Sequence, residues 1–205
     1  MTLTTRVIAS VLDQNYLIQY ANLVLKVSET LVATLVTTSN NSSNISLSLP
    51  NLDVEILMAG SNPLITEIPQ FGTGNAFMDI DLVHISKNNN TAVAFLSYTN
   101  LGNLLKPTFQ TSTNTNNTMM STVVSVSLLK TTNTNLTNAV NITFKHISKL
   151  DPEGILSCVN WDEDTATLQE NICNIIQTNN THTVCSCDQL STFALIMRTD
   201  QCRVR

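Results

Sequence analysis

The first 36 residues carry a hydrophobic pattern with the period of an α-helix. Apolar side chains recur there at steps of three and four residues, and the stretch contains neither Pro nor Gly. Side chains spaced in this way lie on one face of a helix. We therefore predict a helix over Thr4–Val36, with a polar break at Asp13–Asn15 that can divide it in two. The stripe predicted to face the core, with Tyr20 as a core residue, is Leu17, Tyr20, Val24, Val27, Leu31 and Leu35.

Beyond residue 38 the hydrophobic period changes to two. The polar run TTSNNSSN (37–44) predicts a turn or linker. Short alternating segments follow, separated by turns rich in Asn, Thr, Gly and Pro, which is typical of an antiparallel β-sandwich. The predicted strands are 45–49, 54–58, AFMDIDLVHI (76–85), TAVAFLSY (91–98), STVVSVSLL (121–129), AVNITFKHI (139–147), GILSCVNW (154–161), THTVCSC (181–187) and STFALIM (191–197).

The fold class predicted from these patterns is mainly β, with a helical segment before the sandwich. We divide the chain into a helical lead-in (1–38), a β domain (39–198) and a polar tail (199–205). The runs QTSTNTNNTMM (110–120) and TTNTNLTN (131–138) are interpreted as polar loop tips.

Composition narrows the class of protein. Charged residues make up 12% of the chain, about half the usual share of roughly 25%, and the net charge is −5 without a basic cluster. Nucleic acid is therefore excluded as a partner, because phosphate binding needs clustered Lys and Arg. No apolar run is long enough to span a membrane, and the N-terminal residues lack the pattern of an export signal. We expect either a fragment of a longer secreted protein or a cytosolic chain with accidental glycosylation motifs.

Asn-x-Ser/Thr sequons favour the secretory pathway over the cytosol. We expect exposed loops at Asn40 to Asn44, Asn116 and Asn135, and an outward-facing strand position at Asn141. The eight candidate glycosylation sites are Asn40, Asn41, Asn44, Asn89, Asn116, Asn135, Asn141 and Asn179.

Several kinds of catalytic or metal chemistry find little support. With five glycines, the chain contains no phosphate-binding glycine motif. His84, His146 and His182 are scattered, and we interpret them as surface or cross-strand residues. Asp79 and Asp81 alternate along a predicted strand and so face solvent together, and the run 162–165 is interpreted as a solvated turn. We predict no metal site and no cofactor.

Four of the five cysteines gather within 30 residues, and their spacing favours disulfides. Cys158, Cys173, Cys185 and Cys187 contain no CxxC pair that could chelate zinc, although four thiolates could form such a site. A bond between Cys185 and Cys187 would close a strained ring within a strand. Each of that pair is therefore expected to join Cys158 or Cys173, which leaves Cys202 without a partner.

These cysteines belong to a longer pattern that resembles a known family. CVNWD (158–162), Cys173 and CSCDQLSTFALIM (185–197) are similar to the proteolysis-site (GPS) motif of adhesion G-protein-coupled receptors, here at 158–198. That motif ends the GAIN domain, the GPCR-autoproteolysis-inducing domain. AVAFLSYTNLGNLL, STVVSVSLL and AVNITFKHIS resemble its internal strands in order, and GNAFMDIDLVHIS is similar to the EGF-repeat leukocyte group. The resemblance covers about residues 45–198 and, more loosely, the helical lead-in.

The resemblance implies a fold and a mechanism. The fold is the twisted antiparallel sandwich of GAIN subdomain B, preceded by part of the helical subdomain A, with disulfides Cys158–Cys185 and Cys173–Cys187. The Ser191 hydroxyl would attack the Leu190 carbonyl to give an ester that water hydrolyses. The implied setting is the extracellular side of the plasma membrane, the implied partner is the receptor's own seven-helix membrane domain, and an outside ligand is not specified. The segment implied as a tethered agonist is Ser191, Thr192, Phe193, Ala194, Leu195, Ile196 and Met197.

The chain departs from the family pattern at the residue that matters for cleavage. Where the family has a histidine base, this chain has Gln189, whose amide cannot take up a proton at neutral pH. We therefore predict at most slow, single-turnover self-cleavage. A second tryptophan of the family is also missing, and Leu168 lies near its place. The alternatives are an efficiently self-cleaving domain and an unrelated secreted, disulfide-linked β-sandwich that binds carbohydrate or protein.

Overall fold

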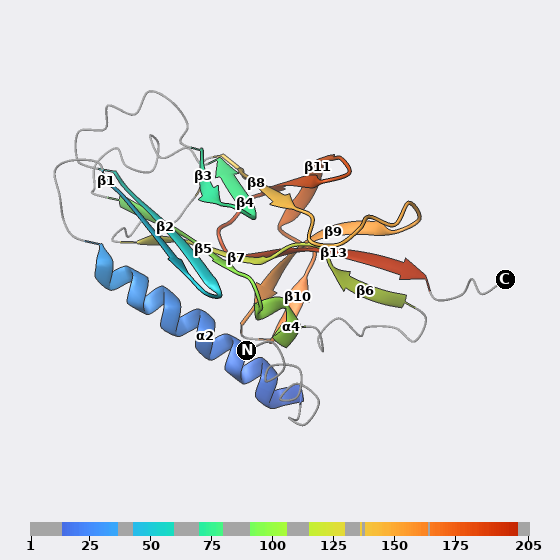
Figure 1. Ribbon diagram of the computed structural model, residues 1–205, viewed down its shortest axis with the longest axis horizontal. Helices are drawn as coiled ribbons and strands as arrows, with labels where there is room; N and C mark the ends of the chain where they lie inside the picture. The colour runs from blue at the N-terminus through green and yellow to red at the C-terminus, as the bar shows by residue number, and fades with distance from the viewer. Residues whose placement is uncertain are drawn as a thin grey trace.

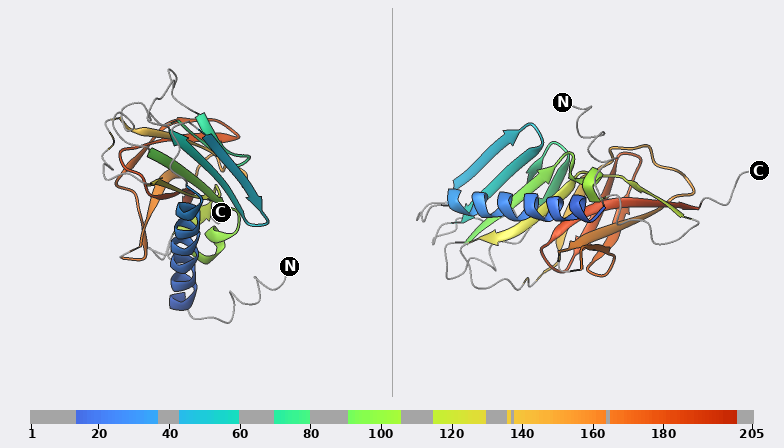
Figure 2. Two further views of the ribbon diagram at one scale, coloured as in Figure 1. Left: turned by 90° about the vertical axis from the view of Figure 1, so that its left-hand side faces the viewer. Right: turned by 90° about the horizontal axis from the view of Figure 1, so that it is seen from below.

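The computed structural model describes residues 14–36, 43–59, 70–79, 91–105, 115–129, 136, 138–163 and 165–200. Two antiparallel sheets pack face to face, and the long helix α2 (Gln14–Leu35) covers the other face of the larger sheet (Figures 1 and 2). The predicted antiparallel β-sandwich with a helix before it is thereby confirmed. Residues 4–13 of the predicted helix lie outside the described ranges.

The larger sheet contains eight described strands in the order β1-β2-β5-β7-β13-β9-β10, and β6 pairs with β13 beside β7. A five-residue helix, α4 (Leu101–Leu105), follows β5. The strands of this sheet are β1 (Ser43–Leu49), β2 (Leu52–Ala59), β5 (Thr91–Tyr98), β6 (Thr115–Met119), β7 (Val123–Leu129), β9 (Ile155–Asp162), β10 (Thr167–Gln169) and β13 (Thr192–Asp200).

The smaller sheet has five described strands in the order β11-β12-β8-β4-β3. Gly72 in β3 packs tightly against the backbone of β4, because an added Cβ would lie 2.2 Å from the carbonyl oxygen of Ala76. The strands of this sheet are β3 (Gln70–Thr73), β4 (Ala76–Asp79), β8 (Val140–Lys145), β11 (Cys173–Thr178) and β12 (His182–Cys187).

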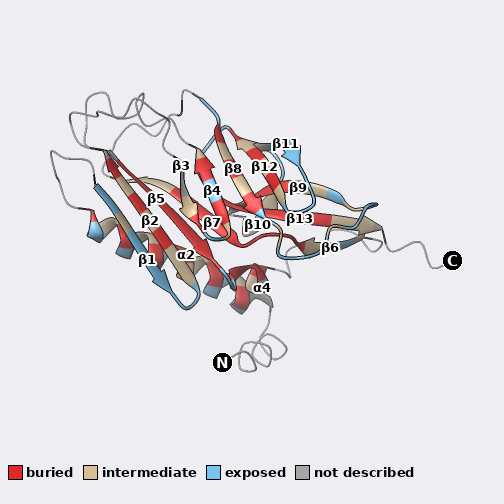
Figure 3. Ribbon diagram, turned by 45° about the horizontal axis from the view of Figure 1, so that its top comes forward, coloured by how far each residue is buried: buried red, intermediate tan, exposed pale blue. Residues whose placement is uncertain are grey.

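Two hydrophobic cores result from these three layers. The first core lies between the helices and the larger sheet, and the second lies between the two sheets. Alternation along each strand decides the assignment, so that in β5 Leu96 enters the first core and Phe95 the second. In Figure 3 the buried positions accordingly concentrate in β5, β13 and one face of α2.

The predicted buried stripe of α2 is wrong for most of its residues. Leu17 is buried and Val24 half-buried as expected, but Tyr20 is 57% and Leu31 60% exposed. Val27 and Leu35 also lie on the exposed side. The face that packs on the sheet consists of Leu17, Ala21, Leu25, Ser28, Val32 and Val36.

Small residues explain why α2 turns this face toward the sheet. Ala21 and Ser28 let the helix approach the strands closely, and Ser28 donates a hydrogen bond back to the carbonyl of Leu25 at 3.2 Å. The hydroxyl of Ser28 also lies 2.8 Å from that of Tyr98 in β5. A search for large apolar residues misses a face of this kind, since both faces of α2 carry them.

Several strand positions have polar side chains, and the hydrophobic pattern therefore did not predict them as strand. Residues 115–119, predicted as part of a loop tip, form β6, so Asn116 lies on a strand rather than in a loop. Asn44 likewise lies on β1, and both asparagines are exposed. Strand β13 continues to Asp200, two residues past the predicted end of the β domain. Asn and Thr can occupy such strands because backbone pairing requires no apolar side chain.

The two faces of α2 can be compared with one pair of substitutions. Leu25→Ala empties a fully buried site and should reduce the free energy of unfolding by about 2–5 kcal/mol. Leu23, which is 56% exposed, is the matched control, and Leu23→Ala should change that free energy by about 0.5 kcal/mol or less. Urea unfolding followed by circular dichroism measures both, and equal losses would contradict this orientation of the helix.

Candidate functional site

Strand β13, which contains all but the first residue (Ser191) of the segment implied as a tethered agonist, lies inside the larger sheet. Residues 192–198 pair with β9 on one side, while on the other side 192–193 pair with β7 and 196–200 with β6. Both faces of the strand are covered. Phe193, Leu195 and Met197 enter the core between the sheets, whereas Ala194 and Ile196 enter the core beneath α2.

A buried serine bridges the gap between β6 and β7. Opposite this gap the Leu195 amide has no strand partner, and it donates to the Ser121 hydroxyl oxygen at 2.8 Å. Ser121 in turn donates to the carbonyl of Thr122 at 2.7 Å, and the Leu195 carbonyl accepts from the Met120 amide at 2.8 Å. The side chain of Ser121 therefore replaces the missing backbone partner of β13.

The peptide bond expected as a cleavage site lies where the chain crosses from the smaller to the larger sheet. Gln189 is exposed, Leu190 is half-buried against the second core, and Ser191 is half-buried. The Ser191 hydroxyl donates to the carbonyl of Trp161 at 3.5 Å, a long hydrogen bond. The Ser191 carbonyl accepts from the Val126 amide at 3.0 Å. The hydroxyl therefore points at a main-chain acceptor rather than at a base.

The described histidines cluster at the other end of β12. His182 is the first residue of β12 and pairs with Lys145, whereas Cys187 at its end pairs with Val140. Five strand positions separate these ends by about 16 Å. The His146 ring nitrogen Nε2 lies 2.9 Å from the hydroxyl of Thr183, near that same first end. His84 falls outside the described residues.

Two disulfides hold the strands before β13. Cys158 of β9 is joined to Cys185, and Cys173 of β11 to Cys187. This is the pairing that the family resemblance implies. The first bond connects the two sheets, and the second connects neighbouring strands of the smaller sheet. Both cysteines of β12 are completely buried, so the segment directly before the crossing is fixed covalently. Cys202 lies outside the described ranges.

Helix α2 makes polar contacts with the strands that flank the start of β13. The Trp161 indole nitrogen in β9 donates to the side-chain oxygen of Asn22 at 2.7 Å. The hydroxyl of Ser125 in β7 donates to the carboxylate of Glu29. Trp161 and Ser125 are the residues that pair with Thr192 on its two sides. The helix is therefore attached to both neighbours of β13.

The polar cluster under α2 also contains Tyr98, which is 3% exposed. Burial raises the pKa of the Tyr98 hydroxyl well above its usual range, while the hydrogen bond with Ser28 acts to lower this pKa. The nearby carboxylates of Glu29 and Glu163 add to the increase in its pKa. The tyrosine is consequently neutral at every physiological pH, and it serves as a hydrogen-bonding anchor for the helix.

The remaining predicted residues fall at separate places. Asn141 lies half-buried on β8, between β12 and β4, and Asn179 caps the β11–β12 turn by accepting from the amides of Thr181 and His182, each at 2.8 Å. Leu168 of β10 pairs with Trp161 and packs on the first core. Within the described ranges no three His, Cys, Asp or Glu side chains form a metal site. Asn40, Asn41, Asp81, Asn89 and Asn135 lie outside those ranges.

Sequence reasoning missed the polar residues that position β13. Ser121, Asn22 and Glu29 carry no motif, and each acts through a partner distant in the sequence. A weak signal for Ser121 existed in the Ser-Thr pair that interrupts an apolar run at 119–124. For Asn22 and Glu29, a sequence signal would have required knowing which face of α2 packs on the sheet, and that face was predicted incorrectly.

The domain is a disulfide-linked antiparallel sandwich that buries its last described strand. The two neighbours of the start of β13 are hydrogen-bonded to α2, and two disulfides lie directly before the strand. The chain matches the family model for GAIN subdomain B, designated GPS, over residues 18–201. It belongs to this family. This finding removes the alternative of an unrelated secreted β-sandwich.

Individual relatives are adhesion receptors. The chain is 32% identical to human adhesion G protein-coupled receptor E3 over 127 residues, which are 58% of the chain and 20% of the receptor. Latrophilin Cirl of Drosophila persimilis is 36% identical over 77 residues, 38% of this chain and 4% of that protein. The chain therefore spans a fifth or less of the curated relatives it matches. The fold is similar to the full extracellular region of zebrafish Gpr126/Adgrg6, with a TM-score of 0.59 and 20% identity over 88% of this chain and 27% of that one.

The contribution of Ser121 can be separated from that of a neighbouring serine. Ser121→Ala leaves the buried Leu195 amide without a partner and should reduce the free energy of unfolding by about 1–3 kcal/mol. Ser127 is the control, because its buried hydroxyl has no hydrogen-bond partner and Ser127→Ala should be neutral or stabilising. Urea unfolding reports both changes, and hydrogen exchange of the Leu195 amide should accelerate only in the first variant.

Proposed function

We propose that this chain is the extracellular, juxtamembrane GAIN/GPS region of an adhesion G-protein-coupled receptor and that β13 is its stored agonist. The observation that carries the proposal is the burial of both faces of β13 between two paired neighbours. A segment stored in this way cannot reach a membrane domain until the sheet opens. The domain would therefore act as a mechanical and regulatory element.

The proposed location is the extracellular side of the plasma membrane, and the proposed partner is the membrane domain of the same receptor. Family membership and the adhesion-receptor relatives support both. The buried disulfides favour an oxidising compartment. Within the described residues no helix is long and apolar enough to cross a membrane.

Retention of β13 rests on hydrophobic contacts and on hydrogen bonds along both edges. Burial of a large side chain contributes about 1.5–3 kcal/mol relative to exposure, and Phe193, Leu195 and Met197 are at most 5% exposed. The ion pair of Arg198 with Glu170 lies at the exposed end of the strand and adds little. Force applied to β13 would therefore have to remove these apolar side chains from the core between the sheets, and Ala194 and Ile196 from the core beneath α2.

We further propose that the Leu190–Ser191 bond stays largely intact. Gln189 offers no proton acceptor, and the Ser191 hydroxyl is directed toward the carbonyl of Trp161. General-base assistance contributes about 10²–10⁴ in rate. A deficit of that size would reduce a cleavage completed during maturation to a slow reaction.

Restoring the base tests this account. Gln189→His should convert the secreted chain into two fragments that separate on a denaturing, reducing gel, because an imidazole can take up the proton of the Ser191 hydroxyl. Adding Ser191→Ala to that variant should abolish the cut. Gln189→Asn, which supplies no base, is the matched control and should remain uncut. An unaltered chain that already migrates as two fragments split at Ser191 would show that the domain is efficiently autoproteolytic.

The agonist role requires a separate experiment. The chain, fused at Asp200 to the membrane domain of human adhesion G protein-coupled receptor E3, should signal weakly, whereas the same fusion starting at Ser191 should signal several-fold more strongly. Phe193→Ala in the shorter fusion should remove most of the gain, since Phe193 is the largest side chain of the strand and is 1% exposed. Thr199→Ala, at the outer end of β13, is the control. Equal signalling by the long and short fusions, with matched surface expression, would refute the agonist assignment.

A further inference from the structure

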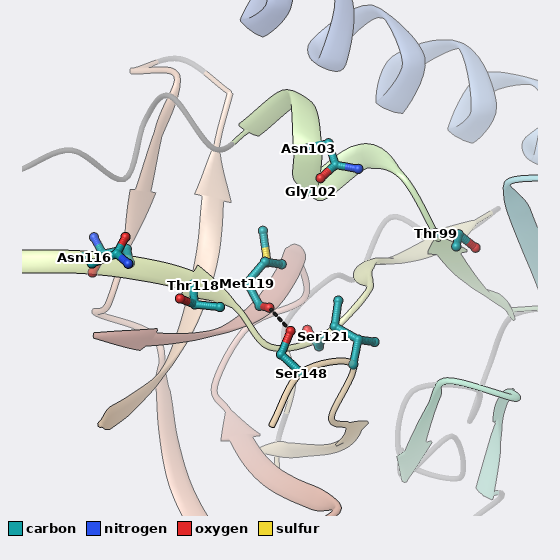
Figure 4. A pocket seen from close by; sticks show the side chains of 10 residues that line it. Thr99, Gly102, Asn103, Asn116, Thr118, Met119, Ser121 and Ser148 are labelled. Carbon is teal, nitrogen blue, oxygen red and sulfur yellow. Dashed lines mark hydrogen bonds between the residues drawn. The ribbon is translucent and has the colours of Figure 1, made fainter. Parts of the chain in front are cut away.

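An uncharged cavity adjoins the strand that holds the C-terminal half of β13. It has a volume of about 410 Å³ and lies between α4, β6 and the Ile147–Ser148 turn (Figure 4). This volume is in the range of small-molecule sites, roughly 300–1,000 Å³. The lining residues that matter here are Asn103, Asn116, Thr118, Met119, Ile147 and Ser148.

The cavity runs along the open side of an edge strand. Strand β6 pairs with β13 on one side, and no other described strand pairs with it. On its open side Ser148 donates a long hydrogen bond of 3.5 Å to the carbonyl of Met119 (Figure 4). Proteins commonly cover such edges, because an exposed edge can pair with another chain.

A glycosylation sequon lies in the wall of this cavity. Asn116 and Thr118, the first and third residues of the sequon, are both lining residues, and Asn116 is exposed on β6. The register pairs Asn116 with Thr199 and Thr118 with Met197, whose side chain enters the core between the sheets. Asn116 and Thr118 therefore share that face of β6, and Figure 4 shows Asn116 at the end of β6 far from Asn103. A sugar attached to Asn116 would therefore start at the cavity itself.

The chemistry of the lining suits an N-acetylhexosamine. The ten lining residues include no Asp, Glu, Lys, Arg or His, which disfavours a charged ligand. Thr118 and Ser148 can exchange hydrogen bonds with hydroxyl and acetamido groups. The 51% exposed Ile147 offers apolar contact to the C–H face of a sugar ring.

We propose that Asn116 carries an N-linked glycan whose first N-acetylglucosamine occupies this cavity and covers the edge of β6. In the linking step, Asn116 Nδ2 forms a bond to the anomeric carbon of a lipid-pyrophosphate-linked oligosaccharide. The bond from that carbon to the pyrophosphate breaks, and the amide nitrogen loses one proton to the host's oligosaccharide transferase. The proposal rests on the extracellular location proposed above. Because β6 holds residues 196–200 of β13, the sugar would also strengthen retention of that strand.

The first test is site occupancy and thermal stability of the full chain secreted from mammalian cells. Intact-glycopeptide mass spectrometry should find a glycan on Asn116. Asn116→Gln should lower the melting temperature by about 2–4 °C, and Thr118→Ala, which removes the same sequon, should give a similar decrease. Asn44→Gln is the matched control, because Asn44 is exposed on edge strand β1 and does not line this cavity; its loss should leave the melting temperature unchanged.

The second test asks whether the first sugar lies in the cavity. Trimming every glycan to a single N-acetylglucosamine should preserve the melting temperature of the unaltered chain. Ile147→Ala should lower it when Asn116 is glycosylated and have little effect in the Asn116→Gln background, because residues that contact one group are not additive. Additive effects of the two substitutions would place the sugar outside the cavity and overturn the proposal.

The pattern of glycosylated sequons distinguishes a failure of the cavity proposal from a failure of the proposed extracellular location. If Asn44 is glycosylated and Asn116 is not, the cavity proposal fails while the extracellular assignment stands. If no sequon of the secreted chain carries a sugar, both the cavity proposal and the argument for glycosylation fail together.

Discussion

The structure depends on the burial of both faces of β13. A strand in a two-layer sandwich usually presents one face to solvent, but here the larger sheet has a core on each side. Phe193 and Leu195 help to hold the two sheets together, while Ile196 packs on the opposite side. Removing β13 would open both cores and separate β9 from β6 and β7. Its retention is therefore coupled to the stability of the whole domain.

The second constraint is the attachment of α2 to the strands beside β13. Asn22 and Glu29 lie two turns apart on the helix, and their partners Trp161 and Ser125 lie on opposite sides of Thr192. Displacing the helix would break hydrogen bonds to both neighbours of the strand and leave buried polar groups without partners, which is costly in a core. Movement of α2 and loosening of the start of β13 are thus linked energetically, through contacts of side chains rather than of backbone.

The sequence predicted the sandwich because its segments alternate between apolar and polar residues. Strands of this kind have one apolar face, which must pack against another layer. It predicted the existence of α2 but not its orientation, since Leu23 and Leu25 are equally apolar and Ala21 and Ser28, small enough for close packing, decided the outcome. Strand β6 was missed for a different reason: its Asn and Thr residues carry no hydrophobic signal, and only the backbone of β13 makes it a strand. The spacing of the cysteines limited the disulfide pairing without deciding it, because the choice depends on which strands become neighbours.

The disulfides limit how far β13 can move from the sheets in a chain whose Leu190–Ser191 bond is intact. Cys185 and Cys187 fix β12 to β9 and β11, and only three residues separate Cys187 from Ser191. An intact Leu190–Ser191 bond therefore keeps the start of β13 within a few residues of the disulfide-bonded sheets, whatever happens to the hydrogen bonds along the strand. Cleavage would allow the strand to leave with a free N-terminus, whereas an uncut strand could only be exposed in place, as a loop still anchored at Cys187. Under the cleavage mechanism proposed above, the residue at position 189 would select between two modes of presenting the same buried segment, while Phe193 and its apolar neighbours would set the force required in either.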